Sequence, residues 1–307
     1  MIHAPFTLLA MLKYIRTLRP ADWIKNLFVF AALAFGGKLT DLEAARLALL
    51  AFVAFCLTAS AGYILNDAID RERDRLHPTK RNRPIASGAV GIPAAAVLFV
   101  VLLVAAASLS YVCLPPAFWG VLGAYFILTV AYSLYLKRRM LLDVLLIAVL
   151  FVLRALGGAC AIDVRVSHWL LICTFMLCVF LGFGKRRCEI TMIANEEDIR
   201  KHRPLLVRYT PDLLNHLLST SAGIAIVTFL LYTLDTTTLS PFGAKKQNLV
   251  FTLPLVVYGI FRYAMLSELG TATGPTEMVL RDRAFLATIV IWAATTAAML
   301  YLDIPPI

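Results

Sequence analysis

Residues 66–88 (NDAIDRERDRLHPTKRNRPIASG) form the most charged stretch of a chain in which 60% of the 307 residues are hydrophobic. If this stretch leaves an apolar segment as a helix, Asn66, Asp70 and Asp74 recur every fourth residue and share one face, with Asp67 one position round. Amide and carboxylate oxygens suit Mg²⁺, which proteins hold through one or two carboxylates, waters and the phosphates of a substrate. The spacing therefore predicts a magnesium site with Asn66, Asp70 and Asp74 as ligands.

Basic residues follow these acids directly, at Lys80, Arg81 and Arg83. Ammonium and guanidinium groups are the usual protein partners of phosphate. The alternative is a solvated loop with balanced charges, an interpretation that suits residues 71–73 and Arg75. The density of acids followed by bases favours a site at which a divalent metal ion and a phosphorylated ligand meet.

The composition excludes an ordinary soluble domain, because the mean hydropathy is +0.80 and only 16% of the residues are charged. Apolar stretches of about 20 residues cross a bilayer core of about 30 Å. We therefore expect an all-α, polytopic integral membrane bundle of nine helices. The expected spans are roughly 23–37, 47–66, 90–112, 116–136, 140–162, 166–184, 213–234, 248–266 and 284–302. The first is weak because Lys25 and Asn26 lie inside it, and residues 1–22 are expected to form an interfacial segment.

Most of the 29 Lys and Arg residues fall in the N-terminal segment and in every second loop. The positive-inside rule then predicts a cytoplasmic N-terminus and a multi-pass protein of the inner (cytoplasmic) membrane. We expect one integral domain, 1–307, whose active-site loops, 66–88 and 185–212, face the cytoplasm. The net charge of +10 indicates attraction to anionic lipid or phosphate, and no nucleic acid partner is expected.

Two further loops carry candidate ligand-binding residues. The segment GKRRCEI places Lys185 and Arg186 beside Glu189, and three consecutive bases exceed what orientation in a membrane requires. In YSLYLKRRMLLD, Lys137 and Asp143 are expected to face the mouth of a cavity. For both loops the alternative is plain anchoring by positive charge.

Arg154 is expected roughly 16 Å deeper than Asp143 along one helix, and on nearly the same face. An arginine inside a membrane normally faces a partner or a polar cavity. Two interpretations stay open: a structural ion pair, or a contact with the phosphate of a lipid. The same two interpretations apply to Lys25 and Asn26.

These segments resemble a known family. Residues 66–88 resemble the first aspartate-rich motif of the UbiA-type intramembrane prenyltransferases, N-D-x-x-D-x-x-x-D followed by R-P-[IL], and this implies a nine-helix bundle open to the cytoplasm. Residues 19–39, 132–143, 151–159 and 180–189 are more similar to the signature segments of the decaprenyl-phosphate phosphoribosyltransferase branch. The resemblance runs from about residue 12 to about residue 285.

That branch implies Mg²⁺-dependent transfer of 5-phosphoribose from phosphoribosyl diphosphate (PRPP) to a polyprenyl (decaprenyl-type) phosphate, with release of pyrophosphate. The lipid product would supply arabinan precursors for cell-wall arabinogalactan. Ordinary members of the superfamily have a second Asp motif in the sixth loop, where this chain offers only Glu189 among bases. That departure favours a sugar phosphate, rather than a prenyl group, as the part of the donor that carries the diphosphate.

The resemblance also implies roles for the candidate residues. Asn66, Asp67, Asp70 and Asp74 would act on the metal-bound diphosphate. The substrate-binding residues would be Lys80 and Arg83 for phosphate oxygens, Lys185, Arg186 and Glu189 for the ribose 5-phosphate end, Lys25, Lys137 or Arg154 for the lipid phosphate, and Asn26 and Asp143 beside them.

Two alternatives remain. The first is a prenyltransferase that moves a prenyl group from a prenyl diphosphate to an aromatic acceptor. The second is a lipid or anion transporter, although transporters usually show repeats and broken helices at the midplane. The sequence leaves open whether the chain forms a homo-oligomer.

Overall fold

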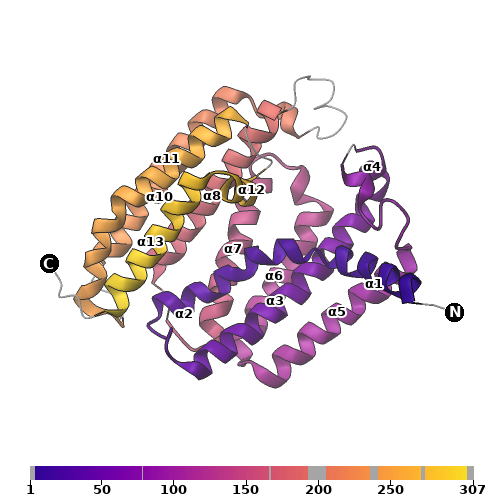
Figure 1. Cartoon of the computed structure of the whole chain (residues 1–307), viewed down its shortest axis with the longest axis horizontal. Helices are drawn as coiled ribbons and strands as arrows, with labels where there is room; N and C mark the ends of the chain where they lie inside the picture. The colour runs from indigo at the N-terminus through magenta and orange to yellow at the C-terminus, as the bar shows by residue number, and fades with distance from the viewer. Residues whose placement is uncertain are drawn as a thin grey trace. The chain divides into compact units, whose positions relative to one another are not determined.

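The computed structural model describes residues 4–77, 79–165, 167–192, 205–235, 241–270 and 274–302. All regular secondary structure within these ranges is helical (Figure 1). The chain divides into two compact units, unit 1 (Met1–Leu33, Lys38–Lys137 and Leu153–Val164) and unit 2 (Ala34–Gly37, Arg138–Val152 and Arg165–Ile307).

The elements of unit 1 come mainly from the first half of the chain. They are α1 (Ala4–Leu18), η1 (Pro20–Phe30), α3 (Leu42–Ile69), α4 (Arg71–Arg75), η2 (Lys80–Asn82), α5 (Ile92–Cys113), α6 (Pro116–Leu134) and η3 (Leu136–Arg138). Three of the described elements are shared with unit 2: η3 at its last residue, α2 (Ala31–Phe35) and α7 (Leu142–Ala161).

The remaining elements belong to unit 2. They are α8 (His168–Met192), η4 (Leu206–Arg208), α10 (Pro211–Leu234), η5 (Gly243–Thr252), α11 (Leu253–Leu269), α12 (Pro275–Arg281) and α13 (Arg283–Tyr301).

Within the described residues, 8 helices are long and apolar enough to cross a membrane: α3, α5, α6, α7, α8, α10, the continuous η5–α11 and α13. These helices confirm a multi-pass, all-α integral membrane protein, and they match eight expected spans to within a few residues at most ends. The ninth expected span, 23–37, is not confirmed. It is instead the 3₁₀-helix η1 followed by the short α2, because Lys25 and Asn26 interrupt its apolar character. The cytoplasmic position of the N-terminus stays a prediction.

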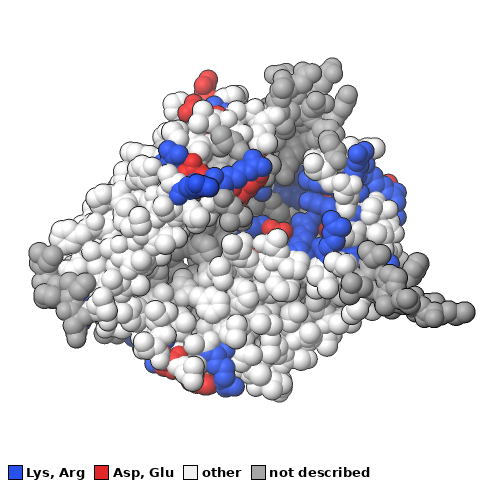
Figure 2. All heavy atoms as spheres, viewed as in Figure 1, with Lys and Arg blue, Asp and Glu red and all other residues white. Residues whose placement is uncertain are grey.

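Helix α3 is the central helix of unit 1. It begins at Asp41, whose carboxylate caps the helix by accepting from the backbone N–H groups of Glu43 and Ala44 at 3.1 Å. Of its most apolar segment 61% is buried, against 17% for α5. Helices α5 and α6 pack against it, and the uncharged surface over α5 in Figure 2 is what a bilayer requires. Lys and Arg gather instead over α4, so the polar end of unit 1 is the end where α3 stops.

Helix α8 corrects the expected start of the sixth loop. Residues 185–192 continue α8 without a break, and residues 205–212 form η4 and the start of α10. Residues 193–204, in the middle of the expected 185–212 loop, lie outside the described residues. Lys185, Arg186 and Glu189 therefore stand on the last turns of a helix rather than in a loop.

The second half of α7 approaches η1 at a glycine. A Cβ at Gly158 would lie 1.9 Å from the backbone oxygen of Val29, and a Cβ at the adjacent Gly157 would lie 2.5 Å from the Phe55 ring. Glycines at helix contacts in membranes allow backbones to come this close. The Gly157–Gly158 pair therefore sets the distance between α7, α3 and η1 in unit 1.

We predict that Gly158→Ala lowers the stability of the folded protein, because a backbone oxygen cannot give way as the end of a flexible side chain can. Overpacking of this kind costs about 1–3 kcal/mol. The measurement is the thermal midpoint in detergent. Gly123→Ala on α6 is the matched control, since nothing lies within 4 Å of the added carbon. Equal midpoints for the two variants would contradict the close contact.

Candidate active site

The acidic motif sits where α3 ends. The helix stops at Ile69, and Asp70 takes the C-cap position with φ −89° and ψ 3° while its N–H donates to Asn66 O. A new helix, α4, starts at Arg71. The predicted single face over Asn66, Asp70 and Asp74 is therefore interrupted at Asp70. The acids form two groups instead of one row.

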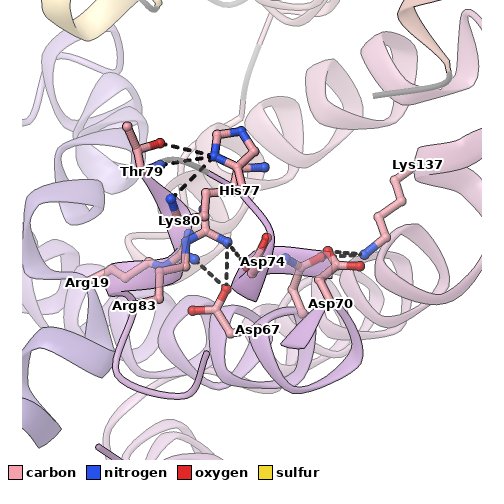
Figure 3. A network of polar contacts seen from close by, with 10 residues as sticks. Arg19, Asp67, Asp70, Asp74, His77, Thr79, Lys80, Arg83 and Lys137 are labelled. Carbon is pink, nitrogen blue, oxygen red and sulfur yellow. Dashed lines mark hydrogen bonds and ion pairs between the residues drawn. The ribbon is translucent and has the colours of Figure 1, made fainter. Parts of the chain in front are cut away.

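The first group is joined by Lys137, which follows α6. Its Nζ donates to Asn66 Oδ1 at 2.9 Å and to Asp70 Oδ2 at 2.6 Å. Figure 3 shows Lys137 reaching Asp70 from a different helix than the one that carries the acids. Asn66, Asp70 and Lys137 were all predicted as site residues, but Lys137 was assigned to the phosphate of the lipid and not to these side chains.

The second group is joined by Arg83. Its Nη1 donates to Asp67 Oδ1 at 3.0 Å and to Asp74 Oδ2 at 2.6 Å, so one guanidinium lies between two carboxylates (Figure 3). Arg19 donates to the same Asp67 oxygen from the other side. Asp67 and Asp74 are only 2% and 3% exposed. Because buried charges are tolerated when they are paired, these contacts explain why Asp67 and Asp74 can both be buried.

The two groups together are electrically balanced. Asp67, Asp70 and Asp74 supply three negative charges, and Arg19, Arg83 and Lys137 supply three positive ones. Every carboxylate of the motif thus has a base within ion-pair distance before any ligand is considered.

Arg19 is a site residue that sequence reasoning missed. Its backbone is left-handed, with φ 54° and ψ 60°, directly before Pro20. Such a conformation is rare in residues other than glycine and costs roughly 1–2 kcal/mol. Ser60 on α3 holds this corner of the chain, residues 18–20 between α1 and η1, by donating to Leu18 O and by accepting from Trp23 Nε1.

The corner is fixed to one face of α3. Ser60, Tyr63 and Asp67 follow one another at helical spacing, and the Arg19 guanidinium lies 5.1 Å from the centre of the Tyr63 ring. The Arg19–Pro20 pair is the local sequence signal that could have indicated a turn here, but it does not indicate the contact with Asp67.

The remaining charged residues of 66–88 lie mainly on α4 and η2. Glu72 pairs with Arg75 at the surface, which agrees with the interpretation of this part as a solvated face. Lys80 lies on η2, next to α4, where its N–H and that of Thr79 lie near His77 Nδ1. No contact in the structure tests the predicted phosphate contacts of Lys80 and Arg83.

Arg154 lies in the packed interior of unit 1. Its Nε donates to Asn26 Oδ1 at 2.7 Å, and its Nη2 donates to the Tyr125 hydroxyl at 2.8 Å. Asn26 Nδ2 in turn contacts Cys56 Sγ at 3.2 Å. These contacts give Arg154 and Asn26 a role in joining α7, η1, α6 and α3, whereas their predicted contact with a lipid phosphate is untested.

Lys25 is the neighbour of Asn26 but has a different environment. It is half-buried and pairs with Asp22 within η1 at 2.5 Å. Lys25 and Asn26, the two polar residues of the first expected span, therefore lie in different environments.

In unit 2, residues that the sequence placed in separate loops come together. Arg186 Nε lies 2.9 Å from Asp143 Oδ2, and Arg186 Nη1 lies 2.6 Å from Glu189 Oε2. Tyr209, which sequence reasoning missed, donates its hydroxyl to Asp143 Oδ1 at 2.8 Å. Arg186 is 7% exposed. The charge of Arg186 is therefore paired with two acids, Asp143 and Glu189.

The other bases of this cluster differ from Arg186. Arg187 donates to Asn215 Oδ1 on α10. Lys185 is half-buried, and its aliphatic chain passes 3.6 Å from the position of a Cβ at Gly274.

The oxygen ligands of unit 1 fit a divalent cation in part. Among the described residues, no three His, Cys, Asp or Glu side chains gather closely enough to hold a metal ion by themselves. Asn66 and Asp70, however, already converge on one cation, the Lys137 ammonium. Asp74 is turned toward Arg83 and would join them only after releasing it. The hard oxygen chemistry of this set suits Mg²⁺.

We predict that Arg83→Ala destabilises the protein by about 3 kcal/mol, because it leaves the buried Asp74 unpaired and weakens the pairing of Asp67. Adding Asp74→Asn to that variant should recover part of the loss, since the unpaired charge is then gone. Thermal midpoints in detergent are the measurement. Arg46→Ala is the control, because its pair with Glu43 is exposed. A midpoint for Arg83→Ala equal to that of the control would show that the ion pairs do not hold this site.

Comparisons with known proteins show the family to which this chain is related. The sequence model of the UbiA prenyltransferase family matches residues 26–289. The decaprenyl-phosphate phosphoribosyltransferase of Mycolicibacterium smegmatis is 35% identical over 297 residues, covering 94% of this chain and 92% of that protein. The protein of the same name from Corynebacterium glutamicum is 32% identical, covering 94% of this chain and 86% of its own length.

The fold agrees with this relationship. A UbiA homologue from Archaeoglobus fulgidus, solved bound to DMAPP and Mg²⁺, matches with a TM-score of 0.70 and 19% identity, covering 94% of this chain and 99% of that one. The sequence and fold likenesses span nearly the whole chain, and the family match alone covers far more than half of it. The chain therefore belongs to the UbiA prenyltransferase family.

Proposed function

We propose that this chain transfers 5-phosphoribose from PRPP to a polyprenyl phosphate at the cytoplasmic face of the inner membrane, releasing pyrophosphate. The observation that carries the proposal is the balanced set of three acids and three bases at the end of α3. The curated relatives that match over more than nine-tenths of the chain support it by their activity.

The balance of charges explains why a metal ion and a diphosphate would bind together. To hold a metal ion, Asn66 and Asp70 would have to release Lys137, and to bind a diphosphate, Lys137 and Arg83 would have to leave their acids. With both ligands bound, the acids would pair with the metal ion instead of a base, and the bases would pair with phosphate instead of an acid. Neither set of charges is then left unpaired in a partly buried site.

Within this proposal, Asn66, Asp70 and Asp74 would hold Mg²⁺ and Asp67 would hold Arg19 and Arg83. The metal ion would supply positive charge for the leaving diphosphate. Lys80, Arg83 and Lys137 would donate to phosphate oxygens, which gives the leaving group further charge stabilisation.

The acceptor needs no general base, because a phosphate monoester oxygen is already anionic near neutral pH. Its attack on C1 of the ribose forms a C–O bond while the bond from C1 to the diphosphate breaks, and the electron pair leaves with pyrophosphate. In-line attack inverts C1. Lys25, Asn26 and Arg154 stay candidates for the lipid phosphate.

The ribose 5-phosphate end is assigned to Lys185 and Glu189, near the end of α8. Arg186 and Asp143 would support them rather than bind phosphate directly, since Arg186 already joins Asp143 and Glu189. The product of this reaction would serve as a precursor of cell-wall arabinan.

We predict that Asp70→Asn and Asp74→Asn each reduce kcat about 100-fold or more, because they remove charge that holds the metal at the leaving group. Purified protein, Mg²⁺, labelled PRPP and a polyprenyl phosphate are the reagents. Glu72→Gln is the matched control on α4, since Glu72 is exposed and pairs only with the neighbouring Arg75 among the contacts of that helix. Undiminished transfer in both aspartate variants would refute the assignment of the metal ligands.

The choice of donor has its own prediction. Pyrophosphate should be released from PRPP only when polyprenyl phosphate is present, and geranyl diphosphate with an aromatic acceptor should give no product. The readout is pyrophosphate formed with each donor and acceptor pair. Prenylation of the aromatic acceptor without turnover of PRPP would favour the aromatic prenyltransferase instead, and passage of lipid or anion without bond breakage would favour a transporter.

A further inference from the structure

A chain of four polar side chains runs through unit 2, from Tyr209 through Asp143 and Arg186 to Glu189. We propose that Tyr209 is a positioning residue that fixes Glu189 through this chain, so that the end of α8 recognises the ribose 5-phosphate part of PRPP. The inference rests on the proposed function and adds a residue to it.

Tyr209 makes two hydrogen bonds with one hydroxyl group. The oxygen accepts from the backbone N–H of Leu141 at 2.7 Å, and the proton is donated to Asp143 Oδ1 at 2.8 Å. Burial raises the pKa of the Tyr209 hydroxyl well above its usual value, and the neighbouring Asp143 carboxylate raises it further. The hydroxyl therefore keeps its proton, and it is a permanent donor to Asp143.

The contact with Leu141 also holds an unfavourable backbone. Leu141 has φ 67°, a region that bulky side chains rarely occupy. The Tyr209 hydroxyl satisfies its N–H just before α7 begins at Leu142. Tyr209 thus fixes both the start of α7 and the carboxylate that α7 carries in its first turn.

The packing of one face of α8 against the first turn of α7 links Tyr209 and Asp143 to Glu189. Gly182, Arg186 and Glu189 recur at helical spacing and share one face. A Cβ at Gly182 would lie 2.5 Å from Val144, so the missing side chain lets α8 approach the first turn of α7. That approach brings Arg186 to Asp143, and Arg186 then holds Glu189 one turn further along.

The chemistry at this end of α8 suits a phosphorylated sugar. Lys185 and Glu189 are four residues apart, so they are neighbours on the helix surface. A fixed carboxylate accepts from ribose hydroxyls, as acidic residues do in nucleotide sites, and an ammonium group pairs with a phosphate. A carboxylate free to rotate would lose this selectivity, which is why the support by Tyr209 matters for binding.

The test is Tyr209→Phe, which removes the hydroxyl and keeps the ring. We expect the KM for PRPP to rise about tenfold, the equivalent of about 1.4 kcal/mol, which is the size of a hydrogen bond to a charged group. The KM for polyprenyl phosphate should stay within about twofold, and kcat should change less than the KM for PRPP. Tyr301→Phe is the matched control, because Tyr301 also donates one 2.7 Å hydrogen bond, to Ala34 O.

A second measurement separates positioning from folding. If Tyr209 acts through Asp143, the effects of Tyr209→Phe and Asp143→Asn on the KM for PRPP should be non-additive, with the double variant close to the worse single one. Additive effects, or a lower thermal midpoint of Tyr209→Phe with an unchanged KM for PRPP, would overturn the positioning role. Wild-type protein that does not turn over PRPP would overturn the proposed function as well, so the two failures are distinguishable.

Discussion

The buried carboxylate of Asp67 is the constraint on which the candidate site of unit 1 depends. It lies near the end of α3 at 2% exposure and accepts from Arg19 on one side and Arg83 on the other. Removing the partners of a buried charge costs about 3–5 kcal/mol, so Asp67 can be kept only if both segments stay in place. The corner after α1 and the segment after α4 are thus tied to the same helix.

This arrangement has a consequence for binding. Arg83 is shared with Asp74, and Lys137 is shared between Asn66 and Asp70, so the bases are held near the acids and near one another. A ligand that brings both signs of charge replaces these contacts at little electrostatic cost, whereas a ligand of one sign breaks them without compensation. This balance of charges is the physical basis of the proposal that a diphosphate and a metal ion bind together.

Much of the fold could be predicted from the sequence, because long apolar segments in a membrane protein have few alternatives. The spans that became α3, α5, α6, α7, α10, η5–α11 and α13 were all expected close to their observed bounds. The first span was less predictable. Its polar Lys25 and Asn26 indicated weakness, but the 3₁₀ geometry of η1 and the contact of Asn26 with Arg154 depend on residues far away in the sequence.

The site shows the same division. The acids of residues 66–74 and the bases Lys137 and Arg83 were predicted as site residues from their types and spacing. The break of the helix at Asp70 is a local change of backbone that residue types and spacing did not indicate. The approach of Arg19 to Asp67 and the meeting of Asp143 with Arg186 and Tyr209 were not predicted either, since each joins segments tens of residues apart. The segment 180–189 offers only Glu189 as an acid, and Asp143 from another segment joins it in space through Arg186.

Lys137 takes the place of a cation between Asn66 and Asp70, and in the proposed mechanism it would leave them when a metal ion and a diphosphate bind. The most direct measurement is the affinity of Mn²⁺ for wild-type and Lys137→Met protein in the absence of PRPP, followed by electron paramagnetic resonance. We expect that removing this base strengthens Mn²⁺ binding, by about tenfold for an effect of about 1.4 kcal/mol, while transfer from PRPP is lost. Mn²⁺ affinity that is unchanged or weaker in Lys137→Met would contradict it.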